Sequence, residues 1–97
     1  MCSSDLCDVL SAGGAQSRVL EIRGPMMVQG VYEPPTMKLT VWQKDMRLIK
    51  AFAHEIGTAT PLFDATIPLY LAAVAEGHGH MDTGAVRLAL EATANRV

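Results

Sequence analysis

The chain has 97 residues, of which 49% are hydrophobic and 19% are charged. This composition is typical of a globular protein and excludes a disordered chain. The formal charge is −2, from 8 basic and 10 acidic residues, so no basic surplus points to a nucleic-acid partner. The length suits one domain, but a domain this small buries about two-thirds of the surface of its unfolded chain and often depends on a partner.

The two cysteines, Cys2 and Cys7, both lie near the N-terminus. A disulfide between them would close a very short loop, so we favour free thiols in a reducing compartment. No basic segment followed by an apolar run resembles a secretion signal, and no stretch approaches the roughly 20 apolar residues of a membrane span. The sequence therefore predicts a soluble, cytoplasmic protein.

Helix signals dominate the chain, whereas strict alternation and hairpin turns are missing from it. We expect an all-α fold, a bundle of about five helices with short connections. The longest helix, at about 37–56, is central. The expected helices span about 5–11, 16–29, 37–56, 61–76 and 83–95.

Several helix boundaries carry capping residues. Thr36 is the expected N-cap of the long helix, and Gly57 is its expected C′ glycine. Thr60 precedes Pro61, which suits the first position of the next helix. Asp82 is the expected cap of the last helix.

Other signals lie inside the expected helices or between them. Ser17 or a neighbouring residue is the expected cap of the second helix. A proline removes a backbone donor and clashes with the preceding turn, so we expect a kink or restart at Pro25 and a bend at Pro68. The prolines in residues 31–36 predict a stiff extended loop, and GHGH at residues 77–80 predicts a break.

A helical wheel of the segment 37–56 separates Lys44 from its neighbour Asp45. Asp45 falls in the middle of one apolar arc, where an ionised carboxylate needs donors or a cation. It is either a structural carboxylate bonded to a helix end or to Arg18 or Arg23, or it borders a polar cleft. Lys44 falls at the rim of the arc, either solvated or leaning into that cleft. The apolar arc holds Leu48, Val41, Phe52, Asp45, Ile56, Ile49, Trp42, Ala53, Met46 and Leu39.

Two further segments could carry chemistry. HGHMD, residues 78–82, contains two histidines and an aspartate, but lacks an evident fourth ligand, so a loop between helices is favoured over a metal site. SAGGAQS, residues 11–17, could present N–H groups to an anion, but it does not follow a strand, and a helix-to-helix turn is favoured. We predict no metal ligands.

Three ordered blocks carry a resemblance: VLSAGGAQSRVLEIRGPMM, YEPPTMKLTVWQKDMRLI and TPLFDATIPLYLAAVAEGHGHMD. From about Val9 onward they resemble the C-terminal domain of the β-hydroxyacid dehydrogenases, the family of 3-hydroxyisobutyrate dehydrogenase and tartronate semialdehyde reductase, with a C-terminal domain like that of 6-phosphogluconate dehydrogenase. The last block matches a pattern that ends in G-x-G-x-x-D, and the Lys44–Asp45 pair matches a Lys-Asp helix motif of the family.

The resemblance implies an NAD(P)-dependent oxidoreductase in which a Rossmann domain binds NAD or NADP and an interdomain helix carries a catalytic lysine. An all-helical C-terminal domain closes the cleft over a small β-hydroxyacid and mediates oligomerisation, so a homo-oligomer, a dimer or tetramer, is expected. By this resemblance Lys44 is the cofactor-binding residue and Asp45 is its structural support. No nucleic-acid or membrane partner is expected.

The departures from the family are also informative. The dinucleotide fingerprint G-x-G-x-x-G, the Rossmann domain and the catalytic-lysine pattern are absent, so no catalytic residue is assigned, and His80 stands where the family often has an acidic residue. Residues 1–8 do not continue the family pattern and resemble an artefactual start, which leaves 9–97 as the helical domain. We therefore expect a truncated fragment that is inactive alone. The alternative is a stand-alone helical dimerisation or binding module.

Overall fold

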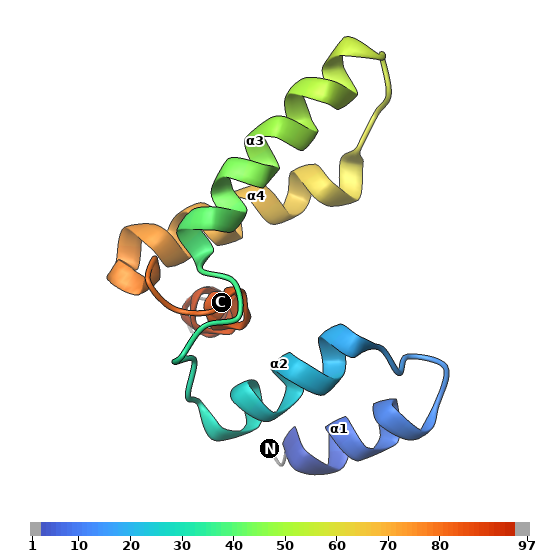
Figure 1. The fold of residues 1–97 in the computed structure, drawn as a ribbon, viewed down its shortest axis with the longest axis vertical. Coiled ribbons are helices and arrows are strands. Elements are labelled where there is room, and N and C mark those ends of the chain that lie inside the picture. Colours follow the sequence, from blue (N-terminus) through green and yellow to red (C-terminus); the bar gives the residue numbers. More distant parts are fainter. Residues whose placement is uncertain (1–2, 95–97) are drawn as a thin grey trace. The chain divides into compact units, whose positions relative to one another are not determined.

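The computed structural model describes residues 3–94, and this part of the chain is all-α, which confirms the expected fold class (Figure 1). Its single β-type pairing is an isolated bridge between Lys38 and Asp82. None of the helices in the described range is long and apolar enough to cross a membrane. The α-helices are α1 (Ser3–Ala12), α2 (Arg18–Gln29), α3 (Leu39–Glu55), α4 (Pro61–Ala73) and α5 (Val86–Ala94), with a π-helical turn at Val74–His78 and a 3₁₀ turn at Thr83–Ala85.

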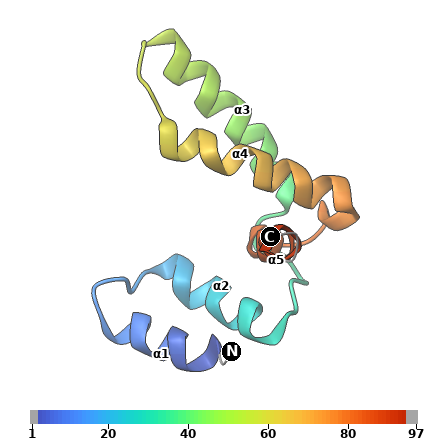
Figure 2. The same ribbon diagram turned by 180° about the vertical axis from the view of Figure 1, so that it is seen from behind.

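The chain divides into two compact units, the first ending at Tyr32 and the second beginning at Glu33. The first unit is a hairpin of α1 and α2, which lie side by side in Figures 1 and 2. Ser17 caps α2 as expected, because its Oγ accepts from the Leu20 N–H at 3.1 Å. The helix continues through Pro25 as a single element, so the alternative of a restart there is wrong.

Close approach of α1 to α2 is possible because Gly24 is buried and lacks a side chain. A Cβ at this position would lie 3.3 Å from the Cys7 Sγ. Cys7 is a half-buried free thiol. Cys2 and the expected end of the last helix at Asn95 lie outside the described residues.

The second unit contains α3 and α4 as a hairpin, and α5 packs against α4 (Figure 2). Gly57 ends α3 in the left-handed region, with φ of +70°. Its N–H donates to His54 O at 3.2 Å, and the Thr58 N–H donates to Ala53 O at 2.9 Å. These two bonds satisfy helix-terminal carbonyls as in a Schellman motif, so the prediction for Gly57 is confirmed.

The expected N-cap of α3 is wrong. The helix begins at Leu39, and its cap position is Lys38, whose side chain makes no capping hydrogen bond. The backbone before it is instead paired with residues 81–83: the Leu39 N–H donates to Met81 O and the Thr83 N–H donates to Met37 O, both at 2.9 Å. This pairing holds residues 37 and 38 out of the helix.

Asp82 is the residue that joins the start of α3 to the start of α5. Its fully buried carboxylate accepts from the Thr36 N–H at 2.9 Å, the Thr36 hydroxyl at 2.8 Å, the Met37 N–H at 3.2 Å and the Gly84 N–H at 2.8 Å. Burial raises the pKa of this carboxyl, but the hydrogen bonds from Gly84, Thr36 and Met37 outweigh burial and hold the pKa below its ordinary value. Asp82 therefore caps the 3₁₀ turn that leads into α5, as expected, and also holds Thr36.

The G-x-G-x-x-D segment makes the turn that delivers Asp82. The α-helical part of α4 ends at Ala73, three residues before the expected end, and a π-helical turn follows in which Gly77 has φ of +93°. Gly79 has ordinary dihedrals, but its O accepts from the Thr40 N–H at 3.2 Å. A Cβ on Gly79 would lie 2.9 Å from Thr40 Cγ2. One glycine thus permits the turn, and the other permits contact with α3.

The core of the second unit is built mostly from small residues. Leu39, Ala73 and Ala85 have no exposed surface, and Ala89 is 2% exposed. Small side chains allow helices to approach closely, but each buries little apolar area. Hydrogen bonds such as those to the Asp82 carboxylate therefore contribute a large share of the stability of this unit.

We expect Asp82→Ala to lower the free energy of unfolding by at least about 3 kcal/mol, because four buried or part-buried donors each lose about 1 kcal/mol or more. The effect should also depend on pH. The folded-state pKa lies below the ordinary 3.8, so the stabilisation is fully present above about pH 5 and is lost as the pH falls through the folded-state pKa. Urea denaturation of both proteins from pH 7 to pH 2.5 measures this.

The wild-type chain should lose stability in acid more steeply than Asp82→Ala. Asp64 provides the internal reference, since the hydrogen bond from Lys50 lowers its pKa too and this contribution stays in the variant. Equal acid slopes would contradict the role of Asp82.

We expect Gly79→Ala to destabilise the chain by about 1–3 kcal/mol through overpacking against Thr40. Thr40→Ser removes the methyl group that the new Cβ would meet. Thermal unfolding of the two single variants and the double variant should therefore give a favourable coupling of about 1 kcal/mol or more. Simple additivity would show that contact with Thr40 is not the reason for the glycine.

Candidate functional site

The residues expected to act together lie on α3, and the structure divides this helix into a buried stripe and an exposed strip. Leu39, Met46 and Ala53, spaced by seven residues, form the stripe that faces the core. This stripe lies at one end of the apolar arc predicted from the sequence. Of the rest of that arc, Trp42 and Asp45 are half-buried, and the other side chains are exposed in the described chain.

The exposed strip consists of Val41, Leu48, Ile49, Phe52 and Ile56, which are 41–69% exposed. On a helix, residues three or four apart are neighbours, so Leu48, Ile49, Phe52 and Ile56 form one continuous apolar surface. Val41 lies two turns earlier, and Lys44 and Asp45 stand between it and the rest of the strip. Contiguous exposed apolar surface of this kind marks an interaction site. Each of these side chains would contribute on the order of 1 kcal/mol or more if a partner covered it fully.

Lys44 lies at the edge of the exposed strip. Val41 precedes it by three residues and Leu48 follows it by four, so both are its neighbours on the helix surface. Its side chain is exposed, and no described residue forms a hydrogen bond or ion pair with it. Lys44 therefore presents a free ammonium group beside an apolar surface, as the rim position predicted.

Asp45 lies within the exposed strip, between Val41 and Leu48 along the helix face. It is half-buried, and no described residue of its own unit forms a hydrogen bond or ion pair with it. Asp45 thus lies outside the buried stripe of α3. The reason is that the core stripe is centred on Met46 and not on the middle of the apolar arc. The supporting role of Asp45 stays a prediction.

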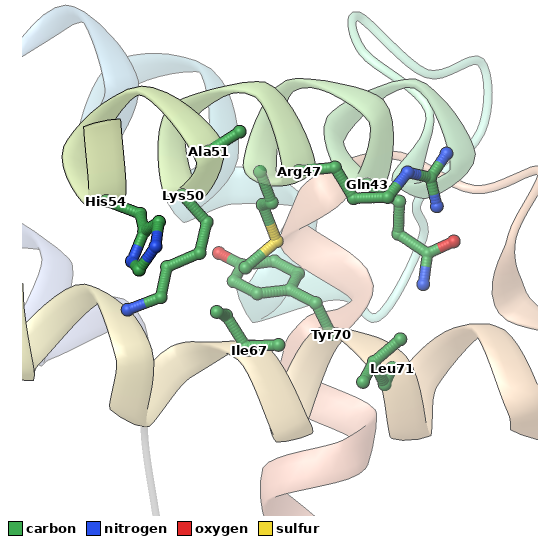
Figure 3. A pocket seen from close by; sticks show the side chains of 9 residues that line it. Gln43, Arg47, Lys50, Ala51, His54, Ile67, Tyr70 and Leu71 are labelled. Atoms are coloured by element: carbon green, nitrogen blue, oxygen red, sulfur yellow. The ribbon is translucent and has the colours of Figure 1, made fainter.

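On the opposite side of α3 a groove runs between α3 and α4, with a volume of about 600 Å³ (Figure 3). Met46, Ile67, Tyr70 and Leu71 supply its apolar surface. Tyr70 also meets Trp42 edge to face, with ring centroids 6.1 Å apart. We refer to it as the α3–α4 groove. Lys44 is not among the residues that line it.

The rim of the α3–α4 groove is basic. Arg47, Lys50 and His54 line it from α3. Lys50 is bound to Asp64 at 2.6 Å, and Asp64 also accepts from the Thr60 hydroxyl at 3.0 Å. These three basic residues lie outside the apolar arc that the wheel defines, but the wheel could not show that α4 lies beside them.

The structure separates the residues of HGHMD. His78 lies 3.9 Å from Glu76, His80 lies 2.7 Å from Glu33, and Asp82 is engaged by backbone and hydroxyl donors. Across residues 3–94, no group of three or more His, Cys, Asp or Glu side chains is placed to hold a metal ion. SAGGAQS forms the turn between α1 and α2, with the Gln16 N–H donating to Gly13 O at 3.2 Å.

Comparison with known families gives one match that covers most of the chain. The model of the family described as NAD-binding of NADP-dependent 3-hydroxyisobutyrate dehydrogenase matches residues 3–89. The match begins six residues before Val9. The division of the chain at residue 8 stays a prediction.

Three characterised reductases are also similar in sequence to this chain. The chain is 35% identical over 91 residues to glyoxylate/succinic semialdehyde reductase 2, chloroplastic, from Arabidopsis thaliana, which covers 94% of this chain and 25% of that protein. It is 33% identical over 84 residues to reductase 1 of the same plant, covering 87% and 29%. It is 31% identical over 86 residues to 2-hydroxy-3-oxopropionate reductase from Escherichia coli, covering 89% and 29%.

Among solved structures, the fold is similar to a crystal structure of 3-hydroxyisobutyrate dehydrogenase from Salmonella typhimurium, with a TM-score of 0.80 and 24% identity. The similarity covers 89% of this chain and 30% of that one. The chain thus spans between a quarter and a third of the length of the relatives it matches.

Two substitutions on α3 distinguish the buried stripe from the exposed strip. We expect Met46→Ala to lower the free energy of unfolding by about 2 kcal/mol or more, since Met46 is 5% exposed, and Leu48→Ala to change it by less than about 0.5 kcal/mol, since Leu48 is 69% exposed. Urea denaturation of both variants measures the difference. A larger loss for Leu48→Ala would mean that the strip is covered in solution.

Proposed function

Since the chain belongs to the family of the NAD-binding domain of NADP-dependent 3-hydroxyisobutyrate dehydrogenase, we propose that it acts as the C-terminal helical domain of an NAD(P)-dependent oxidoreductase for a β-hydroxyacid. In this role it closes the substrate cleft and contributes to oligomerisation. The observation that carries the proposal is the exposed strip of α3 with Lys44 at its edge. The strip is an apolar surface suited to a second domain, and Lys44 is a cation beside it.

Lys44 is the residue that would meet the cofactor. Its ammonium group is exposed and unpaired within the described chain, so it is available to an anionic or polar group of a dinucleotide. The described residues contain no strand followed by a glycine-rich turn, which is the usual cradle for a pyrophosphate. The described residues therefore suit contact with one side of a dinucleotide, while a separate Rossmann domain holds the rest of the cofactor. When bound, the nicotinamide supplies the hydride chemistry.

In this proposal Asp45 supports Lys44 only once a second domain packs on the exposed strip. A second domain that packs on Val41, Leu48 and Phe52 would bury the carboxylate between them. A buried carboxylate requires donors, and in this proposal the covering domain supplies them. Asp45 would then fix the face of α3 that holds Lys44 at the cofactor.

The remaining chemistry is assigned to other parts of the enzyme. The general acid/base lysine belongs to the interdomain helix, so the chain alone is inactive. The complete enzyme is a homo-oligomer, a dimer or tetramer. A stand-alone dimerisation or binding module would use the same exposed strip. Sequencing the genomic DNA upstream of Cys7 distinguishes the two, because an in-frame Rossmann domain supports the enzyme and a genuine upstream stop and promoter supports the module.

A chimera tests the proposed role of Lys44. The E. coli 2-hydroxy-3-oxopropionate reductase would have its matching C-terminal part replaced by this chain, and reduction of 2-hydroxy-3-oxopropionate would be followed with NADH and NADPH. We expect turnover from the chimera and none from the chain alone, because both sides of a cleft are needed to hold the reactants. Lys44→Ala should raise the KM for the nucleotide or lower kcat/KM about ten- to hundredfold, as expected for loss of a charge-assisted hydrogen bond.

Lys38→Ala is the matched control, since Lys38 is also exposed but lies at the start of α3, away from the middle of the exposed strip. It should leave the constants within about twofold of the parent chimera. An unchanged Lys44→Ala chimera would end the assignment of Lys44. A folded chimera without turnover would end the assignment of the domain.

A further inference from the structure

We propose that the α3–α4 groove is a binding site for an aliphatic carboxylate, a fatty-acid-like ligand with a charged head and an apolar tail. The groove lies on the side of α3 away from the exposed strip, and Lys44 does not line it. It is thus separate from the surface assigned above to the cofactor. The inference stands on the shape, lining and charge of the groove.

The shape suits an extended chain. The lining runs from Gln43 to His54 along α3, which is about 16 Å at the rise of an α-helix. The volume of about 600 Å³ lies within the usual range for small-molecule sites. A long groove of this size accommodates a linear tail along the helix axis.

The surface of the groove is apolar where a tail would lie. Met46 lines it from α3. Ile67, Tyr70 and Leu71 line it from α4 (Figure 3). Leu71 is 53% exposed in the open groove. Covering this surface with an alkyl chain removes apolar area from water on both partners, which favours binding.

The charges at the rim select the head group. Lys50 is neutralised by Asp64 at 2.6 Å, whereas Arg47 and His54 form no ion pair with any residue in the range 3–94. The lining includes Arg47, Lys50 and His54 but no carboxylate. An arginine matches a carboxylate through two parallel hydrogen bonds. The groove therefore favours a monoanion over a neutral or cationic amphiphile.

Binding of decanoate to the 97-residue chain tests the proposal. Trp42 is the single tryptophan of the sequence and contacts Tyr70 in the wall of the groove, so its fluorescence reports occupancy; calorimetry gives the affinity. We expect saturable binding of one decanoate, weak binding of decanol, and no binding of acetate. Arg47→Gln should weaken the binding of decanoate about tenfold, whereas Lys38→Gln, the same change of charge outside the groove, should not weaken it.

Leu71→Asp places a carboxylate in the groove at an exposed position and should abolish binding while the circular dichroism spectrum stays unchanged. Equal affinity for decanol and decanoate would overturn the preference for an anion. Equal weakening by Arg47→Gln and Lys38→Gln would show that decanoate is attracted by the overall charge of the chain and not by Arg47 at the groove, which would also overturn the proposal. Analytical sedimentation of the unliganded chain tests whether a second copy of the chain fills the groove instead. A dimer that Leu71→Asp dissociates would show that a second copy fills the groove, and the proposal would be wrong.

Discussion

The buried carboxylate of Asp82 holds together segments that are 46 residues apart in the chain. Its two oxygens accept from donors in the loop before α3 and from the turn before α5. Because the helices are joined by small core residues with limited apolar area, this network determines where α3 begins and which way it leaves the loop. The positions of Lys44, the exposed strip and the basic rim all follow from that starting point.

In the turn that positions Asp82, each of the three fixed residues of the G-x-G-x-x-D pattern is required for a different physical reason. Gly77 supplies a left-handed conformation, Gly79 gives room for α3, and Asp82 provides the acceptors. The requirement on Gly77 is a backbone angle, that on Gly79 is the space beside Thr40, and that on Asp82 is a set of hydrogen-bond donors. The three requirements are therefore physically independent. The pattern is thus a structural device, whereas Lys44, the residue proposed to meet the cofactor, lies on α3.

The sequence predicted features that depend on local chemistry and missed those that depend on distant packing. Ser17, Gly57 and Asp82 lie where capping rules place them, because a cap satisfies backbone groups within a few residues. Thr36 has equally good capping chemistry, yet it binds Asp82, and no local rule detects a partner so far along the chain. The wheel found the apolar arc of α3, but which part of the arc is buried depends on where other helices pack.

The same limit explains the α3–α4 groove and Asp45. Arg47, Lys50 and His54 lie outside the apolar arc of α3, and a wheel of one helix does not show that α4 supplies the other wall of a groove beside them. Asp45 read as a buried carboxylate because its neighbours on the wheel are apolar. Those neighbours are themselves exposed in the described chain.

The alanines at the centre of the second unit set a volume limit. Ala73 and Ala85 have no exposed surface and Ala89 is 2% exposed, beside the buried Gly84. Any larger side chain there would push α4 and α5 apart. The two sides of the unit therefore tolerate change differently: the helix contacts at its centre admit almost no added atoms, whereas the outer surface of α3 can be altered in size and polarity with little penalty to folding. A surface with that freedom can be reshaped for a new ligand or partner while the scaffold beneath it stays fixed.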